Sequence, residues 1–593
     1  MRCRQSSMPG RGNFKNLKNE DQERDSYMSN QKKCIDKKNM YFFAVALLLI
    51  LQIIANVYFG FQKQGFHEDE YYTYFSSNRS LGLYKPDREW QSSETIANEF
   101  MVVPGEGFNY SLVSLVQSWD VHPPLYYFIF HTLCSITAGI LTKWTGIVTN
   151  LIAFAIAYLI LWRIMVRLKV SEPLQLVILA FWGFNPMTIS FNMFIRMYMW
   201  LTVFVFACTY LHIRFVIDTM DGDKAMIPLW KLWITYFLPI MVVSYLGFLT
   251  QYFYMIFFFF MGVGTAMYML VSKRRFVYVA EKPKDKPDAR KVLIMEPLSS
   301  RIKLIILYVI SCAVALGLAV LSYPASASHI FSGYRGTGAI ESFTDASNFT
   351  DRLTFFIGLL NNDVFGGLLI VLLLFMVIAM IYFRCTKDSK LLYASKMSGP
   401  VAITAFATVM YFLVVSKTGL LLGRTSNRYE MPIYGLVIML VLMDAKFSFD
   451  RINKSWIKVV KLFALIILFI PLVYNLTLGK KVLFLYPDDA ERIAYAADNS
   501  DIPVIIYFND ASSEKIWWMT NELLEYPQMY FMSESDTSVI TDETICGADE
   551  LLVYIADNDN TDECIQCILD SNDKLSTVDV VSVKDVWTLY RFE

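Results

Sequence analysis

The sequence predicts a polytopic α-helical membrane protein with about 11 spans, a large outward first loop and a small C-terminal soluble α/β domain. Of the 593 residues, 55% are hydrophobic and only 18% are charged, and the mean hydropathy is +0.39. Soluble domains contain fewer apolar and more charged residues. Apolar runs of the ~20 residues that cross a bilayer recur between residues 40 and 479, and none follows Lys480.

Residues 1–40 are predicted to form a basic polar tail in the cytoplasm. This segment carries ten Lys and Arg residues against five Asp and Glu residues. It lacks the short apolar stretch and the small-residue cleavage site of a signal peptide. The first span, 41–61, is therefore expected to remain uncleaved, and the positive-inside rule keeps its basic flank in the cytoplasm.

The positions of the later basic loops determine the predicted membrane topology. Five of them, which begin near Arg163, Lys224, Lys273, Arg384 and Lys446, lie on the cytoplasmic side only if segment 124–140 does not cross the bilayer completely. If that segment crossed, all five would face outward, and we prefer the first arrangement. The predicted spans are then 41–61, 144–164, 174–190, 196–216, 230–250, 252–271, 304–323, 366–384, 400–416, 430–446 and 457–478, in a membrane domain of 41–479.

Under this topology, the distinctive polar residues lie in outward loops, of which 62–123 and 324–365 are the largest. Each residue also has a structural interpretation. Loop acids are usually solvated, arginines at span ends usually snorkel, and a His before two Pro residues can mark a rigid helix entry. These interpretations do not explain why all of the residues share one side of the membrane.

Residues 480–593 are predicted to form an extracytoplasmic acidic α/β domain. Strands are expected at 482–486, 504–508, 551–555 and 578–583, and helices at 489–499, 514–524 and 561–571. With seven Lys and Arg against 24 Asp and Glu, its formal charge is 7 − 24 = −17, which argues against nucleic acid as a partner. Cys564 and Cys567 form a single Cys-x-x-Cys, a weak indication of zinc or redox chemistry. Residues 276–301 are expected to be a charged cytoplasmic linker without a core.

Four short motifs, in this order and on one predicted membrane side, resemble the C-type glycosyltransferase superfamily of integral membrane enzymes. They are Asp69-Glu70 after the first span, His122-Pro-Pro-Leu-Tyr-Tyr before the next apolar run, Arg196-Met-Tyr at the start of a later span, and Arg428-Tyr-Glu-Met-Pro late in the chain. The likeness is greatest to the bacterial family 39 branch, which is similar to protein O-mannosyltransferases and lipid A aminoarabinose transferases. It covers about residues 41–478.

The resemblance implies transfer of a sugar, with inversion, from a polyprenyl or dolichyl phosphate to an acceptor hydroxyl outside the cytoplasm. It implies that Asp69 is the general base that accepts the hydroxyl proton and that Glu70 orients the acceptor or the sugar. The leaving phosphate needs a fixed cation. The residues expected to bind the phosphate or the sugar are His122, Arg196, Tyr198, Tyr252, Arg424, Arg428 and Tyr429, with Arg335 in reserve.

No metal site is assigned, because the spacing of His67, Glu68 and Asp69 fits no strong zinc pattern, although a divalent metal is left open. The expected partners are the lipid-linked donor, a glycan, lipid or protein acceptor, and the bilayer. The expected location is the plasma membrane, or the endoplasmic reticulum in a eukaryote, with the N-terminus inside. The alternative is a transporter or flippase without covalent chemistry. Transporters usually place charges near the bilayer midplane and contain internal repeats, and the sequence has neither feature.

Overall fold

The computed structural model describes residues 17–79, 87–220, 223–224, 227–272, 275–279, 291–295, 297–385, 398–451, 457–556 and 560–593. It divides into two units, Met1–Gln52 and Ile53–Glu593. In the described part of the first unit the chain forms helix α1, which begins at Leu17 and ends at Gln62 in the second unit. The polar head was not predicted to be helical. From Phe42 onward most large apolar side chains of α1 are exposed, as in a helix with one side toward lipid.

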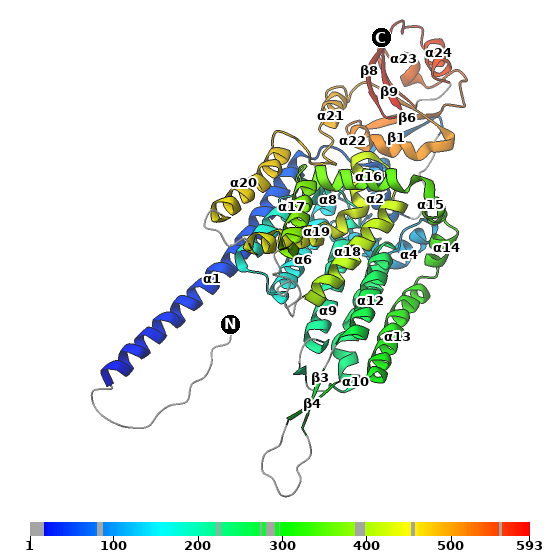
Figure 1. Cartoon of the computed structure of the whole chain (residues 1–593). Helices are drawn as coiled ribbons and strands as arrows, with labels where there is room; N and C mark the ends of the chain where they lie inside the picture. Colours follow the sequence, from blue (N-terminus) through cyan, green and yellow to red (C-terminus); the bar gives the residue numbers. More distant parts are fainter. Residues whose placement is uncertain are drawn as a thin grey trace. The chain divides into compact units, whose positions relative to one another are not determined.

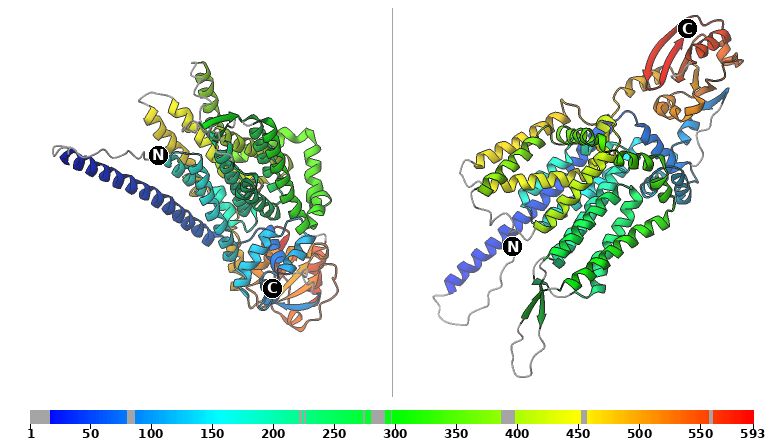
Figure 2. Two further views of the ribbon diagram at one scale, coloured as in Figure 1. Left: turned by 90° about the horizontal axis from the view of Figure 1, so that it is seen from below. Right: turned by 45° about the vertical axis from the view of Figure 1, so that its right-hand side comes forward.

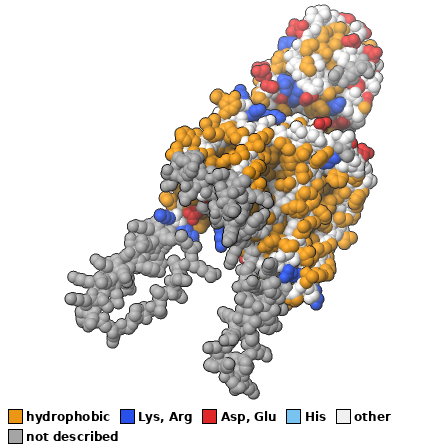
Figure 3. Space-filling model, viewed as in Figure 1, with side chains coloured by type: hydrophobic (Ala, Val, Ile, Leu, Met, Phe, Trp, Pro, Cys, Tyr) orange, Lys and Arg blue, Asp and Glu red, His pale blue; other side chains and the backbone are white. Residues whose placement is uncertain are grey.

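Nine helices in the described part of the chain are long and apolar enough to cross a membrane, and there are 11 if each of two bent helix pairs is one span. This confirms the predicted span count. Many of these helices run side by side (Figures 1 and 2), and hydrophobic side chains cover the face of them seen in Figure 3. The nine are Lys37–Gln62, Lys143–Arg167, Tyr198–Met220, Leu229–Thr250, Tyr254–Val271, Leu298–Ser322, Ser398–Thr418, Gly423–Asp450 and Val459–Leu476.

Several spans consist of more than one element. The eight long spans after α1 are formed by the elements α6 (Lys143–Arg167), α9 (Tyr198–Phe215), η1 (Val216–Met220), α10 (Leu229–Leu232), η2 (Trp233–Phe237), α11 (Leu238–Thr250), α12 (Tyr254–Val271), α13 (Leu298–Ser322), α18 (Ser398–Thr418), η6 (Gly423–Ser426), α19 (Asn427–Arg451) and α20 (Ile457–Leu476).

The two bent pairs have local causes. Helix α7 (Glu172–Gly183) and helix α8 (Pro186–Met193) meet at 50°, where Asn185 caps α8 and Pro186 occupies its first turn, a position that suits proline. Helices α16 (Phe349–Leu359) and η4 (Leu360–Val364) meet α17 (Leu369–Cys385) at 100°. This sharper break contains Gly366 and Gly367, whose φ angles of +59° and +89° favour glycine.

The segment between the first two long spans is helical but short. Helix α5 (Leu125–Ile136) has 12 residues, which reach only ~18 Å, whereas the apolar core of a bilayer is ~30 Å thick. Its length agrees with the prediction that segment 124–140 does not cross the bilayer. The other helices of the two largest predicted outward loops are α2 (Glu68–Asn78), α3 (Ser93–Asn98), α4 (Tyr110–Trp119), α14 (Ala325–Phe331), α15 (Tyr334–Thr344) and η3 (Ala346–Asn348).

The C-terminal part contains a six-stranded sheet in the order β1-β6-β5-β7-β9-β8. The middle strands β6, β5 and β7 are parallel, and their side chains are almost all buried, as expected for strands covered on both faces. The strands are β1 (Glu89–Ser92), β5 (Val504–Phe508), β6 (Gln528–Ser533), β7 (Leu551–Ala556), β8 (Val578–Lys584) and β9 (Trp587–Phe592), and the helices are α21 (Asp489–Asp498), η7 (Asp510–Met519), α22 (Thr520–Leu523), α23 (Glu543–Gly547) and α24 (Thr561–Ser571).

The predicted α/β domain is confirmed in class and corrected in detail. The expected strand at 482–486 is irregular, because Phe484 and Tyr486 have φ angles of +64° and +50°, which no strand accepts. Strands β6 and β9 were not predicted. Strand β1 comes from the first outward loop and pairs with β6, a partner more than 400 residues away that no local pattern indicates.

The first outward loop and the C-terminal sheet share one hydrophobic core. Tyr71 and Tyr74 of α2 belong to the same buried cluster as Ile506 of β5 and Phe531 of β6. The Trp517 ring lies against α2, 4.6 Å from Phe75 between ring centroids. The C-terminal part therefore packs directly on the helix that begins with the predicted acidic residues.

The predicted linker 276–301 contains two strands, β3 (Arg275–Val279) and β4 (Lys291–Met295), which pair antiparallel, and β2 (Asp223–Lys224) pairs with β3. Residues 280–290 and 296 lie outside the described residues, as do residues 1–16 of the predicted basic tail. The linker was predicted to be a charged segment without a core, so these strands are an addition.

Candidate active site

Helix α2 places Asp69 in its first turn through a local capping motif. The Nδ1 atom of His67 accepts the backbone N–H of Asp69 at 3.1 Å, and the Glu70 carboxylate accepts the backbone N–H of His67 at 2.6 Å. These reciprocal bonds form a capping box, which accounts for the spacing of His67 and Glu70. Burial lowers the pKa of His67 to about 4, so its ring is neutral at pH 7 and its 3.5 Å contact with Asp69 is no ion pair.

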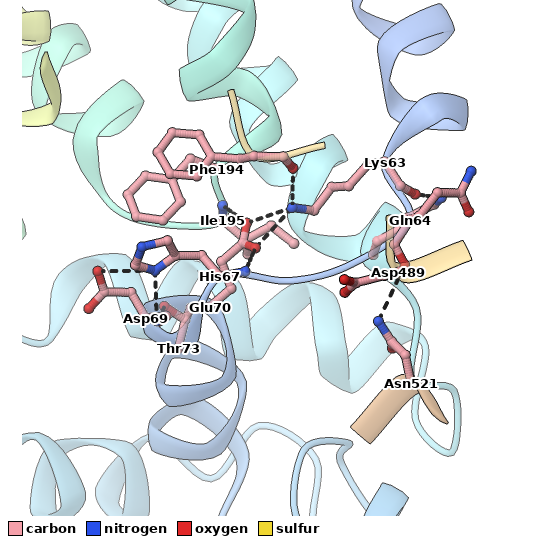
Figure 4. A network of polar contacts seen from close by, with 12 residues as sticks. Lys63, Gln64, His67, Asp69, Glu70, Thr73, Phe194, Ile195, Asp489 and Asn521 are labelled. Atoms are coloured by element: carbon pink, nitrogen blue, oxygen red, sulfur yellow. Dashed lines mark hydrogen bonds and ion pairs between the residues drawn. The ribbon is translucent and has the colours of Figure 1, made fainter. Parts of the chain in front are cut away.

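Glu70 is fully buried, and its carboxylate accepts hydrogen bonds from Lys63, His67 and Ile195 (Figure 4). Lys63 Nζ donates to its two oxygens at 2.9 and 3.2 Å, and the backbone N–H of Ile195 donates to Oε1 at 2.7 Å. The resemblance led us to expect that Glu70 orients the acceptor or the sugar, and this role stays a prediction. Its contacts with the protein tie α2 to the turn that carries Arg196.

Two arginines from distant parts of the chain face the Asp69 carboxylate. Arg428, in the first turn of α19, donates through Nη1 to Oδ2 of Asp69. Arg196, between α8 and α9, has its Nη2 3.9 Å from Oδ1. Their side chains are only 7% and 4% exposed, whereas that of Asp69 is 22% exposed. The carboxylate is thus the part of this cluster that solvent reaches most easily.

Arg196 is held by a chain of polar groups. Its Nη1 donates to Thr73 Oγ1 at 3.1 Å and to the Tyr127 hydroxyl at 3.2 Å, and its Nη2 lies 3.2 Å from His122 Nε2. Because a guanidinium only donates, His122 Nε2 must accept, and Nδ1–H then donates to Asp120 Oδ2 at 2.9 Å. Burial lowers the pKa of His122, with partial opposition from Asp120, so the ring remains neutral. In this tautomer His122 orients Arg196.

The charges around Asp69 set its acidity. Burial alone would raise the pKa of Asp69, but Arg196 and Arg428 outweigh this effect and hold the pKa well below its ordinary value. The carboxylate is therefore ionised and, while both cations face it, weakly basic. The Nε–H groups of both arginines are buried and have no hydrogen-bond partner among the described residues.

Aromatic rings surround Arg428. Its guanidinium lies 5.9 Å from the centroid of Phe194 and 5.3 Å from that of Tyr429. Tyr198 stacks on Phe194 with an interplanar angle of 10° and a centroid distance of 5.9 Å. Of the residues predicted to bind the donor, the structure thus brings His122, Arg196, Tyr198, Arg428 and Tyr429 around Asp69.

Three predicted residues make no direct contact with Asp69 among the described residues, although Arg335 lies near Glu68 and Tyr252 near Asp120. Arg424 pairs with Asp363 at 3.1 Å and donates to the Lys481 carbonyl at 2.8 Å. Arg335 lies over the ring of its neighbour Tyr334, and no contact in the described part of the chain joins it to Asp69. The Tyr252 hydroxyl bonds to His329 Nδ1 at 2.9 Å.

The structure adds functional candidates that the sequence analysis did not single out. Asp120 lies two residues before His122 in a motif that was recognised, so that spacing was a usable signal. Thr73 is one helical turn after Asp69 and shares its face of α2. Tyr127 is the last residue of the His122-Pro-Pro-Leu-Tyr-Tyr motif, so it too had a usable signal. Lys63 has none, because a Lys at a span end has an ordinary structural interpretation. Within the described ranges, no three His, Cys, Asp or Glu side chains gather as a metal site would require.

No protein-family model matches the chain, and no curated protein matches it. Among solved structures, the chain is similar to ArnT from Cupriavidus metallidurans bound to undecaprenyl phosphate, with 12% identity and a TM-score of 0.47 over 92% of this chain and 97% of that chain. It is also similar to the same protein in the apo state, with 12% identity and a TM-score of 0.41 over 88% and 96% of the two chains. At this similarity the function must be inferred from the chain's own residues.

Proposed function

We propose that this protein is a membrane glycosyltransferase that moves a sugar from a polyprenyl or dolichyl phosphate to an acceptor hydroxyl on the extracytoplasmic side. The observation that carries the proposal is the Asp69 carboxylate set between Arg196 and Arg428. The cluster lies at the ends of candidate spans. A lipid tail can therefore remain in the bilayer while its phosphate reaches the two guanidinium groups.

The arginines suit a phosphate for physical reasons. A guanidinium donates paired, charge-assisted hydrogen bonds that match phosphate oxygens. Burial of both side chains strengthens the attraction and removes the need to reorganise during the reaction. The contacts of Arg196 with Thr73, Tyr127 and His122 supply this fixed orientation. Tyr198 and Tyr429 line the Arg428 side of the same site.

In the proposed reaction Asp69 accepts the proton of the acceptor hydroxyl while the hydroxyl oxygen attacks the anomeric carbon. The bond between that carbon and the phosphate oxygen breaks, and its electron pair leaves on the lipid phosphate, which Arg196 and Arg428 stabilise. Attack from the face opposite the phosphate inverts the configuration. An incoming phosphate would also offset part of the positive charge that faces Asp69. Its pKa would then rise, and the carboxylate would become a better base.

The remaining predicted residues receive other roles. Glu70 holds the fold of the site, and His122 orients Arg196. Arg424 is assigned to structure through Asp363, while Tyr252 with His329 is kept as a candidate contact for sugar or acceptor hydroxyls.

The test uses the full-length protein in lipid nanodiscs. Polyprenyl-phosphate-linked sugars are supplied one by one with candidate acceptors, and release of polyprenyl phosphate and formation of the glycosylated product are measured together. Arg428→Met should weaken polyprenyl phosphate binding by at least about tenfold, the worth of one charge-assisted hydrogen bond. Arg424→Met is the matched control and should leave that affinity within about twofold, because Arg424 contacts Asp363 and the Lys481 carbonyl rather than Asp69.

Two outcomes would count against the proposal. Equal losses of affinity in both arginine variants would remove Arg428 as the phosphate ligand. Donor binding by the wild-type protein without transfer of any sugar to any acceptor class would favour a transporter of the lipid.

A further inference from the structure

Lys63, just beyond the end of α1, is buried beside the candidate site with 0% of its side chain exposed. Its ammonium group donates to both oxygens of Glu70, at 2.9 and 3.2 Å (Figure 4). It also donates to the carbonyl of Phe484 at 2.8 Å. A buried charge is tolerated only when it is paired and hydrogen-bonded, and here the three bonds use all the donors that an ammonium has. None of the roles proposed above uses Lys63.

Glu70 connects this ammonium with both sides of the Asp69 cluster. One oxygen accepts the backbone N–H of Ile195, the neighbour of Arg196, at 2.7 Å, and the other accepts the N–H of His67, two residues before Asp69, at 2.6 Å. One carboxylate therefore sets the separation between the base and one of the two cations. Its own position depends on Lys63.

Phe484 connects the same ammonium with the second cation. Its ring stacks on Phe194 with centroids 4.1 Å apart and an interplanar angle of 9°, and the Arg428 guanidinium lies over the same Phe194 ring. The backbone of Phe484 has φ = +64°, a costly conformation for a bulky side chain that persists only where surrounding contacts impose it. The bond to Lys63 is one of these contacts.

We propose that Lys63 is a positioning residue for sugar transfer. Through Glu70 it holds Asp69 and Arg196 at a set separation, and through Phe484 it holds the Phe194 ring that lies against Arg428. This inference rests on the proposed function. A buried ion pair contributes little net stability compared with an apolar pair of the same shape. The main effect of the Lys63 contacts is therefore to fix the positions of their partners. One of these partners, Phe484, lies in the segment that leads into the C-terminal sheet.

The experiment separates turnover from binding in Lys63→Met, a variant of similar length without the charge. A misplacement of ~1 Å can cost about 100-fold in rate, so kcat should fall by about 10- to 100-fold. Affinity for polyprenyl phosphate should stay within about threefold of wild type, because Arg196 keeps its bonds to Thr73, Tyr127 and His122 and these fix its donors. A merely structural role would lower the thermal midpoint, the affinity and kcat together.

Lys584→Met is the matched control, because Lys584 also joins an acid, Asp489 at 3.0 Å, and a carbonyl, that of Trp518 at 3.0 Å. It should lower the thermal midpoint and leave kcat unchanged. The double variant Lys63→Met/Glu70→Gln removes both buried charges, so it should fold even if Lys63→Met does not. A recovered thermal midpoint with a kcat still at least tenfold low supports the positioning role.

Two results would overturn the inference. One is unchanged kcat in Lys63→Met, and the other is recovery of both stability and kcat in the double variant. Absence of transfer by the wild-type protein would refute the proposed function instead, so the two failures are distinguishable.

Discussion

Replacement of Asp69 by Asn separates the two roles that the structure combines at this residue. The change keeps the shape of the side chain but removes the charge that now faces Arg196 and Arg428. It should abolish proton acceptance and lower kcat by about 10²- to 10⁴-fold, the usual contribution of a general base. The same change should tighten binding of polyprenyl phosphate, because the carboxylate competes with the phosphate for the two cations.

The size of the binding effect follows from the contact distances. At the 3.9 Å between Asp69 and Arg196, an effective dielectric constant of ~20 gives an attraction of at most about 4 kcal/mol. The 22% exposure of Asp69 reduces this value toward the ~1.5–3 kcal/mol of a hydrogen bond to a charged group. Relief from this competition corresponds to a gain in affinity of about 10- to 100-fold.

The assay is equilibrium binding of polyprenyl phosphate to wild-type and Asp69→Asn protein in nanodiscs, with kcat measured in the same preparations. Arg424→Met serves as the control for general disturbance of the chain next to Arg428. Weaker binding by Asp69→Asn would refute the reasoning, since it would mean that Asp69 holds the arginines in place for the phosphate. Retained kcat would remove Asp69 as the base.

Three further predictions concern stability. Burial raises the pKa of Glu99 to about 7 from 4.5, so the folded state keeps a proton that the unfolded chain releases, and stability falls as the pH rises through that window. Glu99→Gln should therefore raise the thermal midpoint more at pH 8 than at pH 4.5, and an equal shift at both pH values would contradict this cause. A Cβ on Gly65 would lie 1.9 Å from Asp489 Oδ2 and 2.9 Å from Tyr486 Cβ. Gly65→Ala should therefore lower the free energy of unfolding, measured by chemical denaturation, by about 1–3 kcal/mol. The control is Gly105→Ala, which measures backbone strain alone because Gly105 lies in open space with a φ of +97°. Trp517→Ala should lower the free energy of unfolding by about 3–5 kcal/mol and increase amide hydrogen exchange in α2. Unchanged exchange in α2 would show that the C-terminal sheet does not stabilise this helix.

The spans illustrate what local sequence determines. Apolar runs of bilayer length identify the membrane helices, and the short run at 124–140 agrees with an α5 of only 12 residues. The central strands β5 and β7 were predicted because fully buried parallel strands are continuous apolar runs. Asp69, Arg196 and Arg428 stood out because each lies in a short motif near the end of a span. These features depend on neighbouring residues, and the sequence displays them directly.

Only the tertiary structure decided which of the polar residues meet. Arg428 reaches Asp69 across 359 positions and Arg424 does not, although the two arginines are four residues apart. Lys63 donates to the Phe484 carbonyl, 421 positions away. Strand β1 pairs with β6, which lies near the other end of the chain. Periodicity and composition record whether a side chain is buried, but a side chain's partner is chosen by the packing of distant elements. The sequence therefore determined the membrane fold and the residues that could react, whereas the packing determined which of them form one site.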